Sequence, residues 1–327
     1  MAQPYTVSKQ PHTTSKHSSF LSISELWHCR LGHPSSQHMA HVLGLPCKAP
    51  VTICNICPQA KQHRSSFPVS TSRASCVFDL LHVDIWGPYR TPTYDGYKLF
   101  LSVVDDKPRA TWVFLLSHKS NAFSMLESFI AYINTHFHAQ VHTIRSDNGL
   151  EFGDQHALAF YRRMGITHQT SCLDTPQQNG IVERKHKQLL EVARALLFQS
   201  HVPLKFWGDC ILTATHIINR LPHSVLEFKT PYEFLFKAKP VYDYFKSFGC
   251  LCYMSTLKQG KTKFDARAHP CVFLGYPTAK KAYKVYNLIT KKIHFSRDLV
   301  FHEEYFPFQH MSSPEIVLPN HLFLPSP

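Results

Sequence analysis

At 327 residues the chain can hold a sizeable buried core together with one or two smaller modules. Its 35 Lys and Arg outnumber its 22 Asp and Glu, and this net charge of +13 points to a polyanionic partner, with DNA or RNA ahead of a membrane surface. The sequence has no run of about 18 apolar residues and its first 20 residues lack the apolar segment of a signal peptide, so it argues against a membrane-spanning or secreted protein and predicts an intracellular one.

The amino-terminal part of the chain divides into a polar stretch and a small module. Residues 1–20 are rich in Ser, Thr, Lys and His and show no periodicity, which is typical of a disordered lead-in. Residues 21–69 contain too few apolar side chains to support a core of their own. Because the chain has ten cysteines but no sign of secretion, the close pair Cys54 and Cys57 favours a metal site over a disulfide.

Residues 70–240 have the pattern of an α/β layered core, in which strands and helices alternate after an initial meander. Residues 97–117 are expected to form two strands, because DDKPR at 105–109 suits a hairpin turn between them. The other elements expected are strands over 77–87, 141–149 and 166–173, and helices over 121–137, 152–165, 181–199 and 203–221.

The carboxy-terminal part changes in texture from helices to short strands. Thr230, Pro231 and Glu233 have the spacing of a capping box with proline in the first turn, which predicts a short helix. Residues 245–306 are expected to form a small β-barrel module, and residues 307–327 an extended tail. The strands expected in the barrel cover 271–276, 282–288 and 292–301.

Three acidic residues fall where carboxylates from separate elements can meet. Asp84 lies in an apolar strand, where an unpaired charge is costly to bury. Asp147 ends the strand before the Asn-Gly turn, and Glu183 lies near the start of the strongest predicted helix, over 181–199, beside its apolar face. Phosphoryl transfer by two divalent ions needs such a group of hard oxygen ligands. Singly, Asp147 would be read as a turn residue and Glu183 as a charge that complements the helix dipole.

The spacing and surrounding motifs resemble a known family. Asp147 and Glu183 are separated by 35 residues, as in the D,D(35)E pattern of retroviral-type integrases. Longer stretches are similar to Copia-type LTR retrotransposon Pol: LWHCRLGHPS, LLHVDIWGPY, VVDDKPRATWVFLL, IRSDNGLEF, DTPQQNGIVERKHKQLLEVAR, INRLP and KFDARAHPCVFLGY. The resemblance implies an RNase H-like catalytic core with a mixed five-stranded sheet and helices on both faces. It also implies that Asp84, Asp147 and Glu183 bind two Mg²⁺ or Mn²⁺ ions.

The resemblance also implies an HHCC zinc-binding (GAG-pre-integrase) module within residues 21–69. The corresponding residues are His28, His33, Cys54 and Cys57, whose H-x4-H and C-x2-C spacing suits one structural Zn²⁺ in a helical module. His38 and His41 are a competing histidine pair, so the position of His33 is less certain than that of Cys54.

Basic residues concentrate near the carboxyl end. Between residues 245 and 300 eleven Lys or Arg face two Asp, and aromatic residues lie between them. This composition resembles the SH3-like module of the family, which implies binding to the DNA backbone. The residues expected to contact DNA are Arg184, Lys185, Lys187, Lys261, Lys263, Lys280, Lys281 and Lys284. The alternative for Lys187 is an ordinary surface salt bridge, and for the β module a merely solvated face.

The sequence therefore predicts a retrotransposon integrase that joins element DNA ends to target DNA, works as a homo-oligomer and acts in the nucleus, with no membrane partner. One alternative is an inactive or domesticated polyprotein fragment that only binds DNA. Another is a plain RNase H-type nuclease, which would share the metals but not the other two modules. Asp105 and Asp106 superficially resemble the paired aspartates of reverse transcriptases, but we expect them to shape the turn before Pro108.

Overall fold

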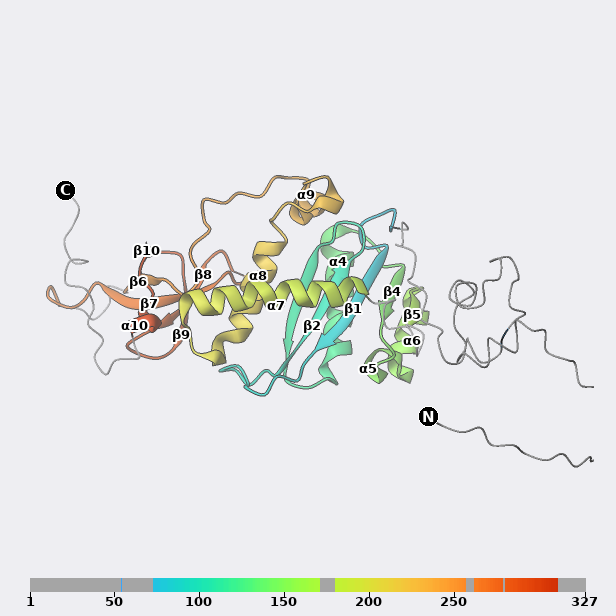
Figure 1. The fold of residues 1–327 in the computed structure, drawn as a ribbon, viewed down its shortest axis with the longest axis horizontal. Helices are drawn as coiled ribbons and strands as arrows, with labels where there is room; N and C mark the ends of the chain where they lie inside the picture. The colour runs from blue at the N-terminus through green and yellow to red at the C-terminus, as the bar shows by residue number, and fades with distance from the viewer. Residues whose placement is uncertain (1–53, 55–72, 171–179, 257–261, 279, 311–327) are drawn as a thin grey trace, which may run out of the picture. The chain divides into compact units, whose positions relative to one another are not determined.

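The computed structural model describes residue 54 and residues 73–170, 180–256, 262–278 and 280–310. The chain forms two compact units, Met1–Ser70 and Thr71–Pro327, and the second contains both the α/β core and the carboxy-terminal sheet (Figure 1). The lead-in predicted for 1–20 and all of the module predicted for 21–69 except Cys54 lie outside the described residues. Across the described part of the chain, no helix combines the length and apolar character needed to cross a bilayer.

The core is built on one mixed five-stranded sheet. Its β1–β2 and β2–β3 pairs are antiparallel, whereas β1–β4 and β4–β5 are parallel. Parallel neighbours need a crossover, and helices supply it on both occasions. The mixed sheet predicted from the sequence is confirmed. Its strands, in the spatial order β3-β2-β1-β4-β5, are β1 (Leu80–Trp86), β2 (Leu99–Asp105), β3 (Thr111–Leu116), β4 (Thr143–Ser146) and β5 (Thr167–Thr170).

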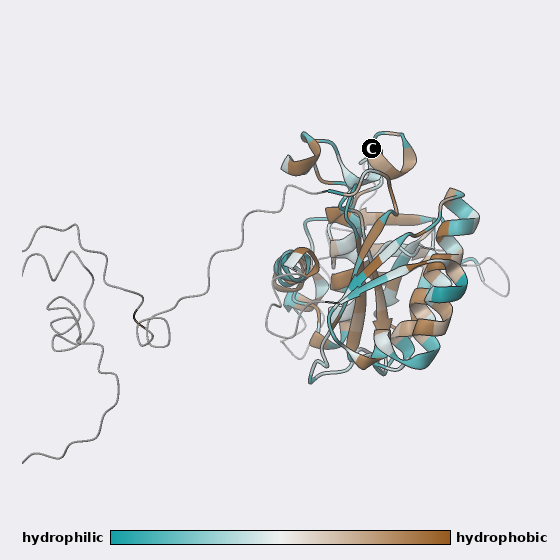
Figure 2. Cartoon of the chain, turned by 90° about the vertical axis from the view of Figure 1, so that its right-hand side faces the viewer, coloured by the Kyte–Doolittle hydropathy of each residue, from teal (hydrophilic) through white to brown (hydrophobic). Residues whose placement is uncertain are grey.

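Helices cover both faces of this sheet, as expected, because successive strand residues point to opposite sides. On β2, Leu101 and Val103 join one apolar cluster with the helices that follow β3 and β4, whereas Phe100 joins a second cluster with Leu189. Figure 2 shows the apolar strands in the middle and helices on either side of them. The first cluster is covered by α4 (Asn121–Phe137), α5 (Leu150–Gly153) and α6 (Gln155–Met164), and the second by α7 (Gly180–Ser200) and α8 (Trp207–Ile218).

Several local signals in the sequence match the structure closely. Gly165 ends α6 in the left-handed conformation, with φ +67°. Thr230 and Glu233 form both hydrogen bonds of the predicted capping box at the start of α9 (Pro231–Phe236). The short 3-10 helices η2 (Leu204–Phe206) and η3 (Ser224–Leu226) connect the longer elements.

The carboxy-terminal module is a five-stranded antiparallel sheet that packs against α7 and α8. Gly249 and Gly275 have φ of +81° and +112°, and a side chain at either position would collide with Ser200 of α7 or Thr213 of α8. Glycine therefore allows the module to approach the core closely. The spatial order is β10-β6-β7-β8-β9, for β6 (Leu251–Ser255), β7 (Ala268–Gly275), β8 (Tyr283–Asn287), β9 (Ile293–Ser296) and β10 (Leu299–His302).

Some predicted boundaries in this module were wrong. The strand expected over 292–301 is two strands, because the backbone N–H of Asp298 bonds the Ser296 hydroxyl in a turn between them. Strand β6 was not predicted at all. The tail expected to be extended begins with a one-turn helix, α10 (Pro307–His310), in which Pro307 is buried; residues 311–327 lie outside the described part.

Candidate metal and DNA-joining site

Asp84 is a carboxylate on the α7 side of the sheet. Leu81 and Val83 belong to the apolar cluster on the other face, so the alternation along β1 directs Asp84 toward α7. Its side chain is 18% exposed, and one oxygen accepts a hydrogen bond of 2.8 Å from the backbone N–H of Ile85. Burial, followed by the negative charge of Asp147, raises the pKa of Asp84 from 3.8 to about 7.

Asp147 follows the last residue of β4, the parallel neighbour of the strand that carries Asp84. It is exposed, and its carboxylate accepts a hydrogen bond of 3.0 Å from the backbone N–H of Gly149. A side chain added at Gly149 would lie 2.9 Å from both the Asp147 carboxylate and the Glu151 carboxylate. The glycine therefore leaves room for two carboxylates to flank this turn.

Glu183 lies in the first turn of α7 and is exposed. Its negative charge also raises the pKa of Asp84, after the larger effects of burial and Asp147. The three predicted residues therefore come from a strand, a strand end and a helix start, and the charges of Asp147 and Glu183 both act on Asp84. The loop before α7, residues 171–179, lies outside the described part.

Glu151 is a fourth acidic residue at this site, and the sequence analysis missed it. Its charge contributes to the raised pKa of Asp84. Its carboxylate lies 3.7 Å from the ammonium of Lys119, which partly offsets its charge. The signal that could have found it is its position two residues after Gly149, in the turn that carries Asp147.

His186 and Ser102 lie next to Asp84, and neither was predicted from the sequence as part of the site. The Nδ1 atom of His186 lies 3.7 Å from Oδ2 of Asp84, and its Nε2 atom lies 2.5 Å from the hydroxyl oxygen of Ser102. Burial lowers the pKa of His186 to about 4, so the imidazole is neutral and forms no ion pair with Asp84 at neutral pH. The Ser102 hydroxyl also donates to the backbone carbonyl of Asp84 at 3.3 Å. The Ser102 hydrogen bond holds the backbone of Asp84, and the neutral His186 imidazole lies beside the carboxylate without neutralising it.

Within the described ranges, no group of three or more His, Cys, Asp or Glu is close enough to hold a metal ion. The structure thus brings the predicted carboxylates into one neighbourhood without closing them into a ligand cluster. Of the predicted zinc ligands only Cys54 is described, and it is partly buried; His28, His33 and Cys57 lie outside the described residues, as do the competing His38 and His41.

Asp105 and Asp106 are structural, and their role is larger than the predicted turn. Asp105 accepts hydrogen bonds from the backbone N–H groups of Phe78 and Lys107. Burial would raise the pKa of Asp106, but the hydrogen bond with His82 and the nearby Arg109 help to lower it to about 2. Both aspartates are almost fully buried, so they tie the start of β1 to the β2–β3 turn.

The basic residues predicted to contact DNA fall into two groups. Lys185 was expected to face solvent, and this is wrong: it is 6% exposed, its pKa is lowered by burial to about 8, and its ammonium donates to the side chain of Gln188. Lys284 was also expected on the basic surface, but it forms an ion pair of 2.7 Å with buried Asp209. The exposed members are Arg184, Lys187, Lys263, Lys280 and Lys281.

The outcome differs for two further residues predicted to contact DNA, Lys187 and Lys261. Lys187 lies 4.0 Å from Glu191 one turn along α7, so the salt bridge that we considered as its alternative role is present. Lys261 lies outside the described residues. A DNA contact by any of these side chains stays a prediction.

The fold and site define an integrase-type catalytic core: a mixed sheet with helices on both faces and carboxylates on and beside its central strands. The matches to known protein families agree with this class. Residues 74–176 match the integrase core domain, residues 4–62 the GAG-pre-integrase domain and residues 250–314 the retroviral polymerase SH3-like domain. The chain belongs to the integrase region of Copia-type retrotransposon Pol polyproteins.

The curated relatives that the chain matches are much longer proteins. It is 31% identical, over 92% of its length, to the retrovirus-related Pol polyprotein from transposon TNT 1-94 of Nicotiana tabacum. It is 32% identical, over 94% of its length, to the corresponding polyprotein from transposon RE1 of Arabidopsis thaliana. The chain spans only 23% and 21% of these two relatives.

Among solved structures, the fold is similar to a chain of the simian T-cell lymphotropic virus intasome, solved in complex with the PP2A regulatory subunit B56 gamma. The TM-score is 0.50 at 16% identity, over 83% of this chain and 95% of that one. At this identity the similarity supports the shared fold.

Proposed function

We propose that this chain joins DNA ends to a target DNA strand by divalent-metal-dependent phosphoryl transfer at Asp84, Asp147 and Glu183. The observation that carries the proposal is the electrostatic state of Asp84. Its carboxylate is largely buried, the three carboxylates of Asp147, Glu183 and Glu151 raise its pKa, and no Lys or Arg forms an ion pair with it among the described residues. A protein seldom buries such a charge without a partner.

A pair of divalent cations fits this donor set. The oxygens are hard ligands of the kind that Mg²⁺ and Mn²⁺ prefer, and positive charge there would relieve the repulsion between Asp84 and Asp147. When bound, the ions supply activation of the attacking hydroxyl and neutralisation of the leaving oxygen. The chain itself contributes the carboxylates, and the Ser102 hydroxyl holds the backbone of Asp84 through its carbonyl.

The proposal extends to a structural zinc ion, to the DNA partners, to the oligomeric state and to the cellular location. The donor set of His28, His33, Cys54 and Cys57 suits one structural zinc ion within residues matched to the GAG-pre-integrase domain. DNA ends and a target duplex are the proposed partners, and a homo-oligomer in the nucleus holds two ends together. The net charge of +13 supports a polyanionic partner.

A strand-transfer assay tests the central part of this proposal. An end-labelled oligonucleotide and a target plasmid are incubated with the full chain in Mn²⁺ and, separately, in EDTA. We expect joined products in Mn²⁺ only, and a loss of at least about a thousandfold in Asp84→Asn, because oxygen ligands that position the reacting atoms act as a unit.

Glu191→Gln is the matched control, since Glu191 is an exposed acid two turns beyond Glu183 on the same helix. It should leave joining unchanged. Binding without joining would instead favour a fragment that only binds DNA. Cutting without joining would favour an RNase H-type nuclease. Joining that survives Asp84→Asn would remove these residues from the proposed role.

A further inference from the structure

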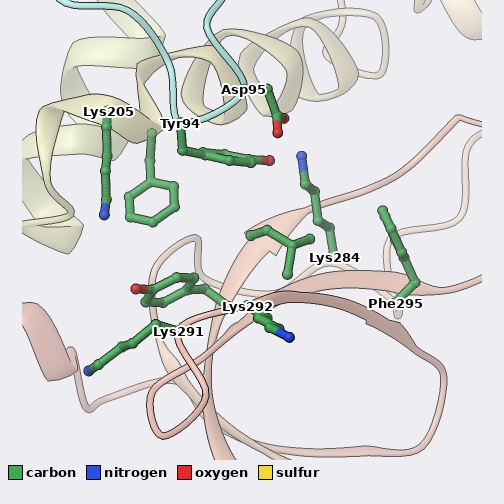
Figure 3. A pocket seen from close by; sticks show the side chains of 10 residues that line it. Tyr94, Asp95, Lys205, Lys284, Lys291, Lys292 and Phe295 are labelled. Atoms are coloured by element: carbon green, nitrogen blue, oxygen red, sulfur yellow. The ribbon is translucent and has the colours of Figure 1, made fainter.

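A pocket of about 470 Å³ opens between the core and the carboxy-terminal sheet, and its lining includes none of the three proposed catalytic carboxylates. Tyr94 and Lys205 line it from the core, and Phe295 and two lysines of the β8–β9 turn line it from the module. Figure 3 shows Tyr94 and Lys205 on one side of the open space and Lys291 and Lys292 on the other.

The pocket carries uncompensated positive charge. Four lysines line it, together with one acidic residue, Asp95. Lys284 is already neutralised by Asp209 at 2.7 Å. Lys205, Lys291 and Lys292 form no ion pair with any residue that the structure describes. Three cations are therefore available to an anionic ligand.

Two of these cations are held in place by a tight turn. The backbone N–H of Lys291 bonds the carbonyl of Asn287, and the backbone N–H of Asn287 bonds the carbonyl of Lys292. The buried side chain of Asn287 accepts two more hydrogen bonds, from Ile289 and Thr290. Because the backbone is fixed, ligand binding needs to order only the lysine side chains.

Aromatic rings alternate with these cations. The ring centroids of Tyr94 and Tyr286 lie 5.4 and 5.2 Å, respectively, from the ring centroid of Phe206. The ammonium of Lys205 lies 5.8 Å from the Tyr286 ring. Phe295 is 44% exposed, and the ammonium of Lys280 lies 4.2 Å from its ring centroid. Rings interleaved with free ammonium groups are the combination that binds unpaired nucleotides, through base stacking and phosphate contact.

We propose that this pocket binds an unpaired nucleotide of a DNA strand, with the base against Phe295 and the phosphate at Lys291 and Lys292. Paired bases in a duplex are stacked on one another and have no free face for the Phe295 ring, whereas the bases of a single-stranded end do. An acidic peptide would satisfy the lysines but would leave the rings without a stacking partner. This site goes beyond the carboxylate site and selects the state of the DNA rather than performing chemistry on it.

Fluorescence anisotropy tests the pocket in EDTA with the full chain, so the result does not depend on strand transfer. One probe is a blunt hairpin duplex, and the other is the same duplex with a short single-stranded extension that carries 2-aminopurine. We expect Phe295→Ala to weaken binding of the extended probe about tenfold and to leave the blunt probe within about twofold, because stacking is worth about 1–3 kcal/mol per base.

A charge-matched pair of double variants separates the pocket from general attraction to DNA. Lys291→Gln with Lys292→Gln should weaken the extended probe at least about fivefold more than Lys263→Gln with Lys281→Gln, which removes two exposed lysines outside the pocket. The fluorescence of 2-aminopurine should be quenched by the unmodified chain and restored in Phe295→Ala. Thermal unfolding of each variant confirms that it is folded.

Three results would overturn the proposal. Equal losses on the two probes would show backbone binding alone. Unchanged 2-aminopurine fluorescence on binding would show that no ring stacks on the base. Displacement of the probe by an acidic peptide at a lower concentration than by a single-stranded oligonucleotide would assign the pocket to a protein segment.

Discussion

Asp84 and Asp209 are two largely buried carboxylates that differ in the charges around them. Asp209, on α8, is 3% exposed and has the ammonium of Lys284 at 2.7 Å. Asp84, on β1, has Asp147 and Glu183 as electrostatic neighbours, so its surroundings add negative charge rather than remove it. Burial raises the pKa of both, to about 6 for Asp209 and about 7 for Asp84.

The difference separates a structural carboxylate from one that we propose to be functional. Asp209 and Lys284 join α8 of the core to β8 of the module, and the pair is complete within the chain. The positive charge that Asp84 needs must come from outside the described residues. A raised carboxylate pKa can therefore mark either a structural ion pair or a functional site. A cation within a few ångströms, such as Lys284 beside Asp209, indicates the first.

Removing the partner of Asp209 should have the largest effect on stability. Lys284→Met would leave Asp209 buried and unpaired, which we expect to lower the free energy of unfolding by about 3–5 kcal/mol. Urea denaturation measures this change. Adding Asp209→Asn to the same chain should restore much of it, since the unpaired charge is then gone. If the single and double variants are equally unstable, the lysine stabilises the interface by packing and not by charge.

His216 offers a pH-dependent test of the same interface. It lies on α8, its ring stacks on Tyr276 at 4.2 Å, and burial lowers its pKa to about 3. Between pH 6.5 and about 3 the unfolded chain binds a proton at His216 that the folded chain does not. Stability from this group is therefore complete above pH 6.5 and is lost progressively as the pH falls to about 3.

Replacing His216 by Gln should make the stability–pH profile shallower over that range, by up to about 1.4 kcal/mol per pH unit. Unfolding followed by tryptophan fluorescence at several pH values gives the two profiles. His201, an exposed histidine beyond α7, is the control, and His201→Gln should leave the slope unchanged. Equal slopes for the unmodified chain and His216→Gln would show that the imidazole is protonated in the folded state.

Local signals were enough to predict much of the core. The bounds of α4 are those expected from its apolar periodicity, and the capping box at Thr230 appears as predicted, because both depend on neighbours within a few residues. The three carboxylates could be predicted to lie in one neighbourhood because an apolar strand, a strand end and a helix start each restrict where a side chain points, and the family motifs indicated the positions; their catalytic role stays a prediction.

Long-range contacts explain what the sequence did not predict. Asp209 and Lys284 are 75 residues apart, and nothing near Lys284 distinguishes it from the exposed lysines before it. Lys185 was misplaced because its charge suggested solvent. Its spacing from Val182 and Leu189 instead puts it in the buried stripe of α7, and this spacing could have been noticed. Strand β6 was missed because LCYMS lacks the regular alternation of a half-buried strand.

The stability of Asp84→Asn without metal tests the central claim most directly. Because the folded pKa of Asp84 is raised to about 7, its charged form destabilises the fold above that pH and not below 3.8. In EDTA at pH 8 we therefore expect the variant to be more stable than the unmodified chain, by on the order of 2 kcal/mol. Mn²⁺ should raise the melting temperature of the unmodified chain and leave that of the variant unchanged. A variant that is less stable in EDTA and still responds to Mn²⁺ would contradict the account, because Asp84 would then be a structural carboxylate like Asp209.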